Sequence, residues 1–135
     1  MGLAPSVSTF VMPEEQGSTS DLCYLASNND ISAIQLLLES GASVDAQDEE
    51  GQTALHFASD RAHMHLIQLL IQAKATVNLQ TTDGQTALHY AAAAEQFDAC
   101  MALLDAGADR SIKDEDGAIA CDASENAELQ NLLRP

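Results

Sequence analysis

Apolar residues recur with a helical period in short blocks along most of the chain. Ile31, Ile34, Leu37 and Leu38 stand at positions i, i+3, i+6 and i+7, which predicts one apolar helix face. Further apolar blocks that predict short helices lie at 53–58, 65–72, 88–92, before Gly107, and around Leu129–Leu133. Helices of about ten residues are marginally stable alone. We therefore expect these helices to be stabilised by stacking on one another.

The same pattern returns every 33 residues. Gly51, Gly84 and Gly117 share this spacing, and Gly51–His56 and Gly84–His89 both read Gly-Gln-Thr-Ala-Leu-His. A 33-residue period with Thr-x-Leu-His at the head of each unit resembles the ankyrin repeat, a helix-turn-helix unit with a protruding β-turn finger. The resemblance implies an all-α ankyrin-repeat solenoid, in which stacked units form an elongated slab with a broad concave surface.

The repeat register divides the chain into an arm and one repeat domain. Residues 1–17, with prolines, glycine and serines but no helical period, are predicted to be a flexible linker or arm. Its apolar group Thr9–Met12 is able to lie across the first repeat. The predicted ankyrin-repeat domain spans 18–135, with repeats at 18–47, 48–80 and 81–113 and a partial capping repeat at 114–135.

The last repeat departs from the pattern in a way that is typical of the end of a solenoid. Ile119, Cys121 and Asp122 stand where the other repeats have Thr, Leu and His. Its second helix is short, around Leu129–Leu133. Terminal repeats are commonly atypical because one of their faces meets water. We therefore predict a C-terminal cap.

A few positions carry local predictions. Ser20 is expected to cap the first helix, and Gly41 to end the second in the left-handed conformation. Lys74 occupies the same turn in the second repeat, where a left-handed backbone costs a residue with a Cβ about 1–2 kcal/mol. Ala62 and Glu95 replace the glycine that usually separates the two helices of a repeat.

The chain is strongly acidic, with 21 acidic and 5 basic side chains and a formal net charge of −16. This charge repels phosphates and anionic lipids, so we predict no nucleic-acid binding and no stable membrane insertion. A protein partner with a basic surface is the natural complement. The sequence shows neither a long apolar run nor a secretory signal pattern. We expect the protein in the cytoplasm, with the nucleus as a second location.

The cysteines and the N-terminal sequence resemble functional motifs but have ordinary explanations. Cys23, Cys100 and Cys121 form no Cys-x-x-Cys pair and are predicted to be reduced thiols that fill the core. The opening Met1–Ser6 fits the pattern for N-myristoylation of Gly2. The acidic residues that follow oppose binding to anionic membranes, so an ordinary start site is the preferred interpretation.

Histidines are the most tempting candidates for catalysis, but a structural role explains them better. His56 and His89 each follow a Thr by three residues, so each ring is expected to bond back across the first turn as in a capping box. His63 and His65 point to different faces of a helix, which disfavours a metal site. The sequence contains no catalytic or metal-ligand motif. We predict no enzyme activity, no cofactor and no metal site.

Two sets of residues leave a structural and a binding interpretation open. Tyr24, Phe57 and Tyr90 are spaced by 33 and should form a column, either packed between repeats or exposed as anchors for a partner. The acidic finger tips either serve turn geometry or form a rim on the concave side that steers a basic partner, and both can hold. The acidic residues of the finger tips are Asp48, Glu49, Glu50, Asp83, Asp114, Glu115 and Asp116.

The ankyrin resemblance also implies where a partner binds. Ankyrin units usually contact partners through the finger tip and the exposed side of the first helix. The positions that match, together with two of the aromatic residues, are Glu49, Glu50, Gln52, Phe57, Asp60, Arg61, Thr82, Asp83, Gln85, Tyr90, Ala93 and Ala94. Ala93 and Ala94 leave room for the close approach of a helix or strand.

A finer resemblance rests on Leu55–His63, Asp83–Ala91 and Lys113–Gly117. These segments resemble the ankyrin region of animal and plant proteins that join an N-terminal acyl-CoA-binding domain to C-terminal ankyrin repeats. The resemblance covers roughly residues 20–133. It implies a role in handling long-chain acyl-CoA through a domain absent from this chain, while this half binds proteins such as an N-myristoyltransferase.

Two further expectations depend on family resemblance. As an alternative, the ankyrin module itself contacts an acyl chain through an apolar groove near Phe57 and Tyr90, or regulates acyl-CoA binding by a neighbouring domain. Asn78 also resembles the asparagine that ankyrin proteins can present to an asparaginyl hydroxylase.

Overall fold

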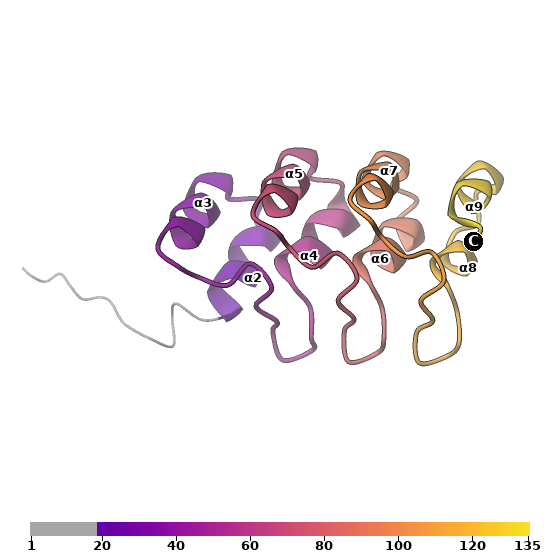
Figure 1. The fold of residues 1–135 in the computed structure, drawn as a ribbon, viewed down its shortest axis with the longest axis horizontal. Coiled ribbons are helices and arrows are strands. Elements are labelled where there is room, and N and C mark those ends of the chain that lie inside the picture. The colour runs from indigo at the N-terminus through magenta and orange to yellow at the C-terminus, as the bar shows by residue number, and fades with distance from the viewer. Residues whose placement is uncertain (1–18) are drawn as a thin grey trace, which may run out of the picture.

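The computed structural model describes residues 19–135, which fold into a row of stacked helix pairs (Figure 1). These residues contain helices and turns but no strand. The predicted all-α solenoid is confirmed. The helices are α2 (Thr19–Ser27), α3 (Ile31–Glu39), α4 (Ala54–Arg61), α5 (Met64–Gln72), α6 (Ala87–Ala93), α7 (Phe97–Asp105), α8 (Ala120–Ala123) and α9 (Ala127–Leu133).

The first helices of the repeats form one row and the second helices form the other. Helix α4 packs between α2 and α6, and α6 packs in turn against α8. Figure 1 shows this row on the side from which the finger loops project. The fingers and the first helices therefore share one side of the slab.

The 33-residue period puts equivalent side chains into one continuous core. Leu22, Leu55 and Leu88 occupy the same slot of three successive first helices, and each is at most 2% exposed. Burial of a Leu or Ile side chain contributes about 1.5–3 kcal/mol. The short helices thus owe their stability to the neighbouring repeats. A second buried slot, in the second helices, holds Ile34, Ile67 and Cys100.

The two Thr-x-x-His segments form the predicted capping boxes. Thr53 Oγ1 accepts from the backbone N–H of His56 at 3.4 Å, and the N–H of Thr53 donates to His56 Nδ1 at 3.1 Å. The other ring nitrogen, Nε2, therefore carries the proton and donates to the carbonyl of Gln85, 3.0 Å away in the next finger. Thr86 and His89 repeat this arrangement. The histidines cap helices and also join one repeat to the next.

The fingers are held to one another by backbone hydrogen bonds. The N–H of Thr82 donates to the carbonyl of Glu50 at 3.0 Å, and the N–H of Glu115 donates to that of Asp83 at 2.9 Å. Gly51, with φ +79°, lies so close to the next finger that a Cβ there would stand 2.8 Å from the Thr82 nitrogen. The close approach of the fingers, as well as the turn, therefore requires glycine.

The predicted left-handed turn positions are confirmed. Gly41 has φ +104° and Lys74 has φ +72°. Ala62 and Glu95 also have positive φ, at +54° and +58°. Asn29, at +56°, is the equivalent position of the first repeat. Asn29, Ala62 and Glu95, which all carry a Cβ, therefore form the turn between the two helices of a repeat, where glycine is usual.

Some predicted helix starts are wrong by one residue. Helix α2 already includes Ser20, so Ser20 is not the cap that we expected. Helix α5 begins at Met64 rather than at His65. Helix ends shift in this way because their terminal residues lack intrahelical partners. The short α8 and α9 agree with the degraded pattern of the last repeat.

The arm predicted at 1–17, including Gly2 and Thr9–Met12, lies outside the described residues.

Candidate functional site

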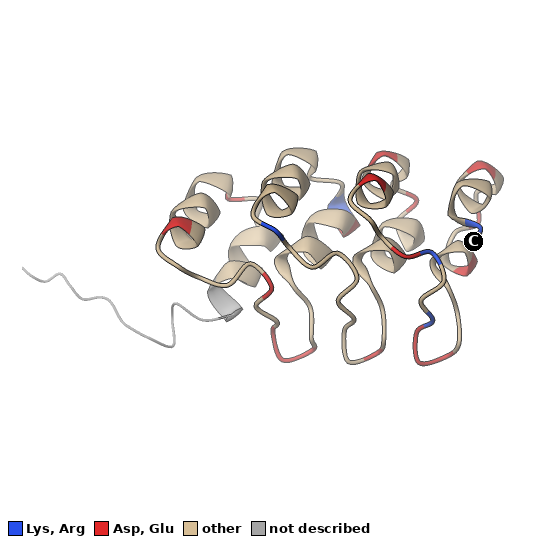
Figure 2. Ribbon diagram, viewed as in Figure 1, with Lys and Arg blue, Asp and Glu red and all other residues tan. Residues whose placement is uncertain are grey.

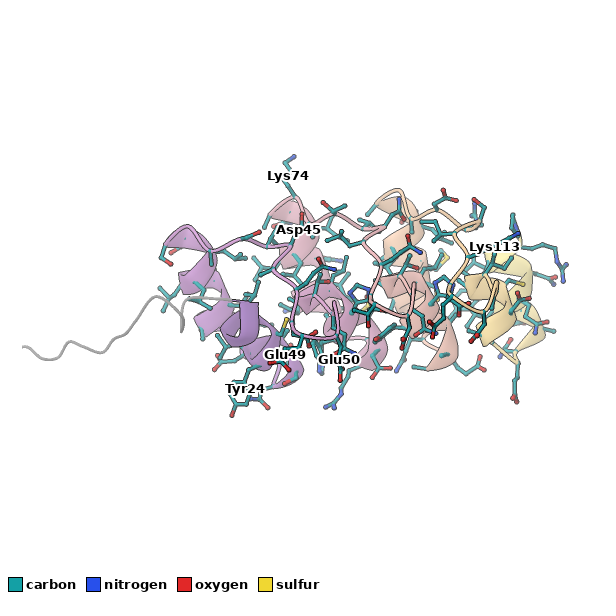
Figure 3. The ribbon with its side chains drawn as sticks, turned by 90° about the horizontal axis from the view of Figure 1, so that it is seen from below. Tyr24, Asp45, Glu49, Glu50, Lys74 and Lys113 are labelled. Carbon is teal, nitrogen blue, oxygen red and sulfur yellow. The ribbon has the colours of Figure 1, made fainter. Side chains whose placement is uncertain are left out.

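A cleft of about 350 Å³ opens between α2, α4 and the first finger. Tyr24 and Phe57 contribute aromatic rings from the two helices, and Asp48, Glu49 and Glu50 contribute carboxylates from the finger. Tyr24 is 67% exposed and Phe57 is half-buried. Figure 3 shows Tyr24, Glu49 and Glu50 on the same side of the molecule. We call this cleft, whose lining also includes Cys23 and Ser27, the acidic cleft.

The finger acids divide into turn-forming and free groups. Asp48 Oδ1 accepts from the backbone N–H groups of Glu50 and Gln52, at 2.9 and 2.8 Å. Asp114 makes the equivalent bonds in the last finger, where they hold its pKa below the usual range. Turn geometry therefore explains these two aspartates. Glu49, by contrast, is exposed, as are Glu50, Asp83, Glu115 and Asp116.

Negative charge accumulates along the finger tips, as Figure 2 shows for all three fingers. The carboxylate of Asp83 raises the pKa of Glu115 in the neighbouring finger. Burial, assisted by the field of Asp48, raises the pKa of the Cys23 thiol to about 11. The fingers therefore form an edge of closely spaced like charges. We call Glu49, Glu50, Asp83, Glu115 and Asp116 the finger edge.

The aromatic column divides between the two interpretations. Tyr90 is half-buried, and its ring meets that of His56 edge-on, with centroids 5.0 Å apart and planes at 70°. Its hydroxyl accepts from Gln52 Nε2 at 2.7 Å, and burial raises its pKa. Tyr90 therefore serves packing between repeats. Tyr24 is largely exposed and remains available as an anchor.

Several predicted partner-binding residues already have structural partners. Gln52 Nε2 donates to the Tyr90 hydroxyl, and Gln85 Nε2 donates to Asp114 Oδ2 at 3.5 Å. The hydroxyl of Thr82 donates to the Glu50 carbonyl at 3.2 Å. Their side chains are less free than the sequence alone indicates.

The remaining predicted residues lie at the ends of first helices. Asp60 and Arg61 are exposed at the end of α4. Ala93, the last residue of α6, is exposed, and Ala94 beside it is half-buried. These four residues lie outside the set that lines the acidic cleft.

The groups that resemble chemical sites are structural in the described part of the chain. Burial lowers the pKa of His56, which keeps this capping ring neutral. Cys23, Cys100 and Cys121 are free thiols, and burial raises the pKa of Cys100 to about 12. Residues 19–135 contain no group of three side chains placed to hold a metal ion.

The bridges between repeats that escaped the sequence analysis include three made by Asp45, Asn78 and Glu95. The Asp45 carboxylate accepts from the N–H and hydroxyl of Thr76, at 2.7 and 2.6 Å. One repeat later, Asn78 Oδ1 accepts from the N–H of Asp109 at 2.8 Å. Because Asp45 and Asn78 are 33 residues apart, the period itself was the signal. The third bridge joins Glu95 to the last repeat and had no such signal.

Comparison with known proteins agrees with this architecture. A family model for ankyrin repeats, in three copies, matches residues 22–114. The chain belongs to the ankyrin-repeat family. Over 47 residues it is 43% identical to a protein named integrin-linked protein kinase 1 from Arabidopsis thaliana. The match covers 35% of this chain and 10% of the kinase, so the chain spans about a tenth of that relative.

Membership of the family places this chain among modules that typically bind other proteins and do not catalyse reactions. None of the helices in residues 19–135 has the length and apolar character that a membrane span requires. The surface to examine for a protein partner is therefore the side that carries the fingers and the first helices.

Proposed function

We propose that this ankyrin module binds a basic protein surface along its finger edge, with a cationic side chain entering the acidic cleft. The acidic cleft carries the proposal because it places exposed carboxylates and an exposed ring around one cavity. Tyr24 offers a ring that is 67% exposed, and Glu49 and Glu50 stand across the same cleft. The cationic side chain of an arginine or lysine can pair with the carboxylates and lie over the aromatic ring.

The magnitudes favour binding through several contacts. A cation over an exposed aromatic ring gains about 0.5–1 kcal/mol, and an exposed ion pair contributes about 0–1 kcal/mol. One side chain in the cleft therefore gives weak binding. The finger edge extends the same charge over two further fingers, so a basic patch that follows it adds contacts and faster association. Because these charges are exposed, salt should weaken the complex.

The test is titration with a basic model peptide. An arginine-rich peptide and a glutamate-rich peptide of equal length are titrated into the protein, at low salt and at about 0.15 M salt, where the screening length is about 8 Å. We expect binding of the arginine peptide alone, weaker at the higher salt. The variant Glu49→Lys/Glu50→Lys/Asp83→Lys should lose at least about tenfold in affinity, since several ion pairs are reversed.

A matched control separates local recognition from overall charge. Glu39→Lys/Glu128→Lys/Glu125→Lys changes the net charge equally at exposed positions of α3 and the last repeat, outside the finger edge. This control should keep most of the affinity. Equal losses in both variants would show a nonspecific charge effect and would overturn the proposed site. A pull-down with the same two variants then identifies natural partners.

A finer proposal is that the chain belongs to a protein that handles long-chain acyl-CoA. Its support is the resemblance of Leu55–His63, Asp83–Ala91 and Lys113–Gly117 to the ankyrin regions of acyl-CoA-binding-domain proteins. In this proposal a separate domain binds acyl-CoA, and the ankyrin module binds proteins such as an N-myristoyltransferase. Calorimetry of the chain with long-chain acyl-CoA should then show no heat of binding.

The alternative, direct contact with an acyl chain near Phe57 and Tyr90, predicts measurable heat in the same titration. Carboxylates line the cleft beside Phe57, and they repel the phosphates of acyl-CoA. The surroundings of Phe57 therefore favour the indirect role.

A further inference from the structure

The first repeat carries an apolar groove on α2 and α3. The groove encloses about 440 Å³ and is lined by Tyr24, Leu25, Ala33, Leu36, Leu37 and Ser40. None of these side chains is charged. Among residues 19–135, Tyr24 and Leu36 are the two most exposed large hydrophobic residues, at 67% each. We call this the first-repeat groove.

Comparison with the second repeat shows what the groove lacks. Leu69 and Leu70 of α5 are the equivalents of Leu36 and Leu37. Leu69 lies half-buried beside α3, in a furrow shared with Leu38. Leu70 is fully buried, whereas Leu37 is only partly so. The first-repeat groove is therefore the face that a preceding neighbour covers in every later repeat.

We propose that the chain's own residues Phe10–Met12 cover the first-repeat groove. Residues 1–13 contain no Asp, Glu, Lys or Arg, and Phe10–Met12 is an uninterrupted apolar group. The groove and this segment therefore match in chemical character, while the charged side chains of the chain are mostly acidic. Burial of apolar area supplies the driving force.

The connection is long enough for this contact. Seven residue steps lead from Met12 to Thr19, and at about 3.3–3.6 Å per residue they reach at most about 25 Å. Helix α2 has nine residues and is about 13 Å long at 1.5 Å per residue. Any point along the groove is within reach. Tethering also gives an effective concentration in the millimolar range.

A second copy of the chain is a weaker candidate for the same groove. Two copies bring together net charges of −16 each, and like charge opposes association. The first-repeat groove also shares Tyr24 with the acidic cleft. A segment that covers the first-repeat groove would therefore also hold Tyr24 in place beside the acidic cleft.

The test is NMR on the whole chain with labelled methyl and aromatic groups. We expect NOEs between the Phe10 ring and the Leu36 methyl groups that do not change on dilution. Phe10→Ser/Val11→Ser/Met12→Ser should remove these NOEs and shift amide signals of α2 and α3 selectively. The matched control Ser6→Ala/Ser8→Ala/Thr9→Ala should leave both unchanged. These variants alter no residue of the helical repeats, so loss of folding does not confuse the result.

The other outcomes overturn the proposal. Absence of these NOEs, with unchanged α2 and α3 signals in the triple-Ser variant, shows that the segment does not cover the groove. NOEs that appear only between differently labelled molecules, and weaken on dilution, assign the groove to a second copy. Binding of a basic peptide by Glu49 and Glu50 is measured in a separate titration, so failure of one proposal can be distinguished from failure of the other.

Discussion

The two ends of the solenoid are finished in opposite ways. At the last repeat, α8 and α9 are short, and the exposed residues are mainly polar, including Glu125, Glu128 and Asn131. At the first repeat, Tyr24 and Leu36 stay exposed. The sequence thus supplies a polar cap at one end and an apolar face at the other. A solenoid needs both ends protected from water, which is why the first end calls for additional cover.

The largest expected effect is the loss of one buried side chain at each end. Ile34 of α3 and Leu133 of α9 are both fully buried. We expect Ile34→Ala and Leu133→Ala each to lower the free energy of unfolding by about 2–5 kcal/mol, through lost burial and the cavity that remains. Urea denaturation measures the loss, and hydrogen exchange locates it in α3 or α9.

An exposed residue of the last repeat provides the control for these two variants. Asn131→Ala, on the surface of α9, should change stability by less than about 0.5 kcal/mol. If Ile34→Ala cost less than about 1 kcal/mol, the first repeat would not depend on this side chain for its docking, and the comparison between the two ends would fail.

A smaller effect is expected at the turn that follows each second helix. Lys74→Gly relieves a left-handed strain of about 1–2 kcal/mol but adds about 0.5–1 kcal/mol of backbone entropy cost. The difference of these ranges is about 0–1.5 kcal/mol, and we expect a net gain near its middle, seen as a higher melting temperature. In the first repeat, Gly41→Ala should cost about 1 kcal/mol, because φ there is +104° although space is free.

The residue before Lys74 gives a matched control. Ala73 has φ −82°, so Ala73→Gly relieves no strain and should not stabilise the protein. An unchanged or lower melting temperature for Lys74→Gly would show that its side chain compensates for the strain in the turn.

The period explains which parts of this structure could be predicted from the sequence. Repeated slots fixed the helices, the caps and the acidic fingers, because the same local chemistry recurs at each of them. The period could not assign a different role to each aromatic residue, because that role depends on the neighbouring repeat. Tyr90 packs on His56 and Gln52 of the repeat before it, whereas no described repeat precedes Tyr24.

The candidate site was predictable only in part for the same reason. Glu49 and Glu50 followed from family geometry, and Tyr24 and Phe57 from the spacing of the aromatic residues. That these four residues line one cleft depends on how α2, α4 and the first finger come together. Glu95 gave no signal at all. Its neighbours Ser124 and Glu125 lie in a repeat whose sequence departs from the pattern, so the period cannot indicate their contact.

The smallest expected effect concerns the bridge that Glu95 makes to the last repeat. Its Oε1 accepts from the Ser124 hydroxyl at 2.6 Å, and its Oε2 accepts from the N–H of Glu125 at 2.9 Å. These bonds lower the pKa of Glu95 from its ordinary value of 4.5. A carboxylate with a lowered folded-state pKa stabilises the protein above its unfolded-state pKa. That contribution is lost as the pH falls through the folded-state value.

Melting temperatures of the wild type and Glu95→Gln, measured from pH 6 to pH 3, test this bridge. We expect the wild type to melt higher at pH 6, because the introduced amide keeps at most one of the two bonds and carries no charge. The difference should close as the pH falls below 4.5 toward the lowered pKa, since the protonated acid resembles the amide. Glu128→Gln, exposed on α9, serves as the control with no bridge to lose. A difference that stays constant with pH would assign the role of Glu95 to its backbone turn, and the last repeat would then be held by apolar packing and the other hydrogen bonds between repeats.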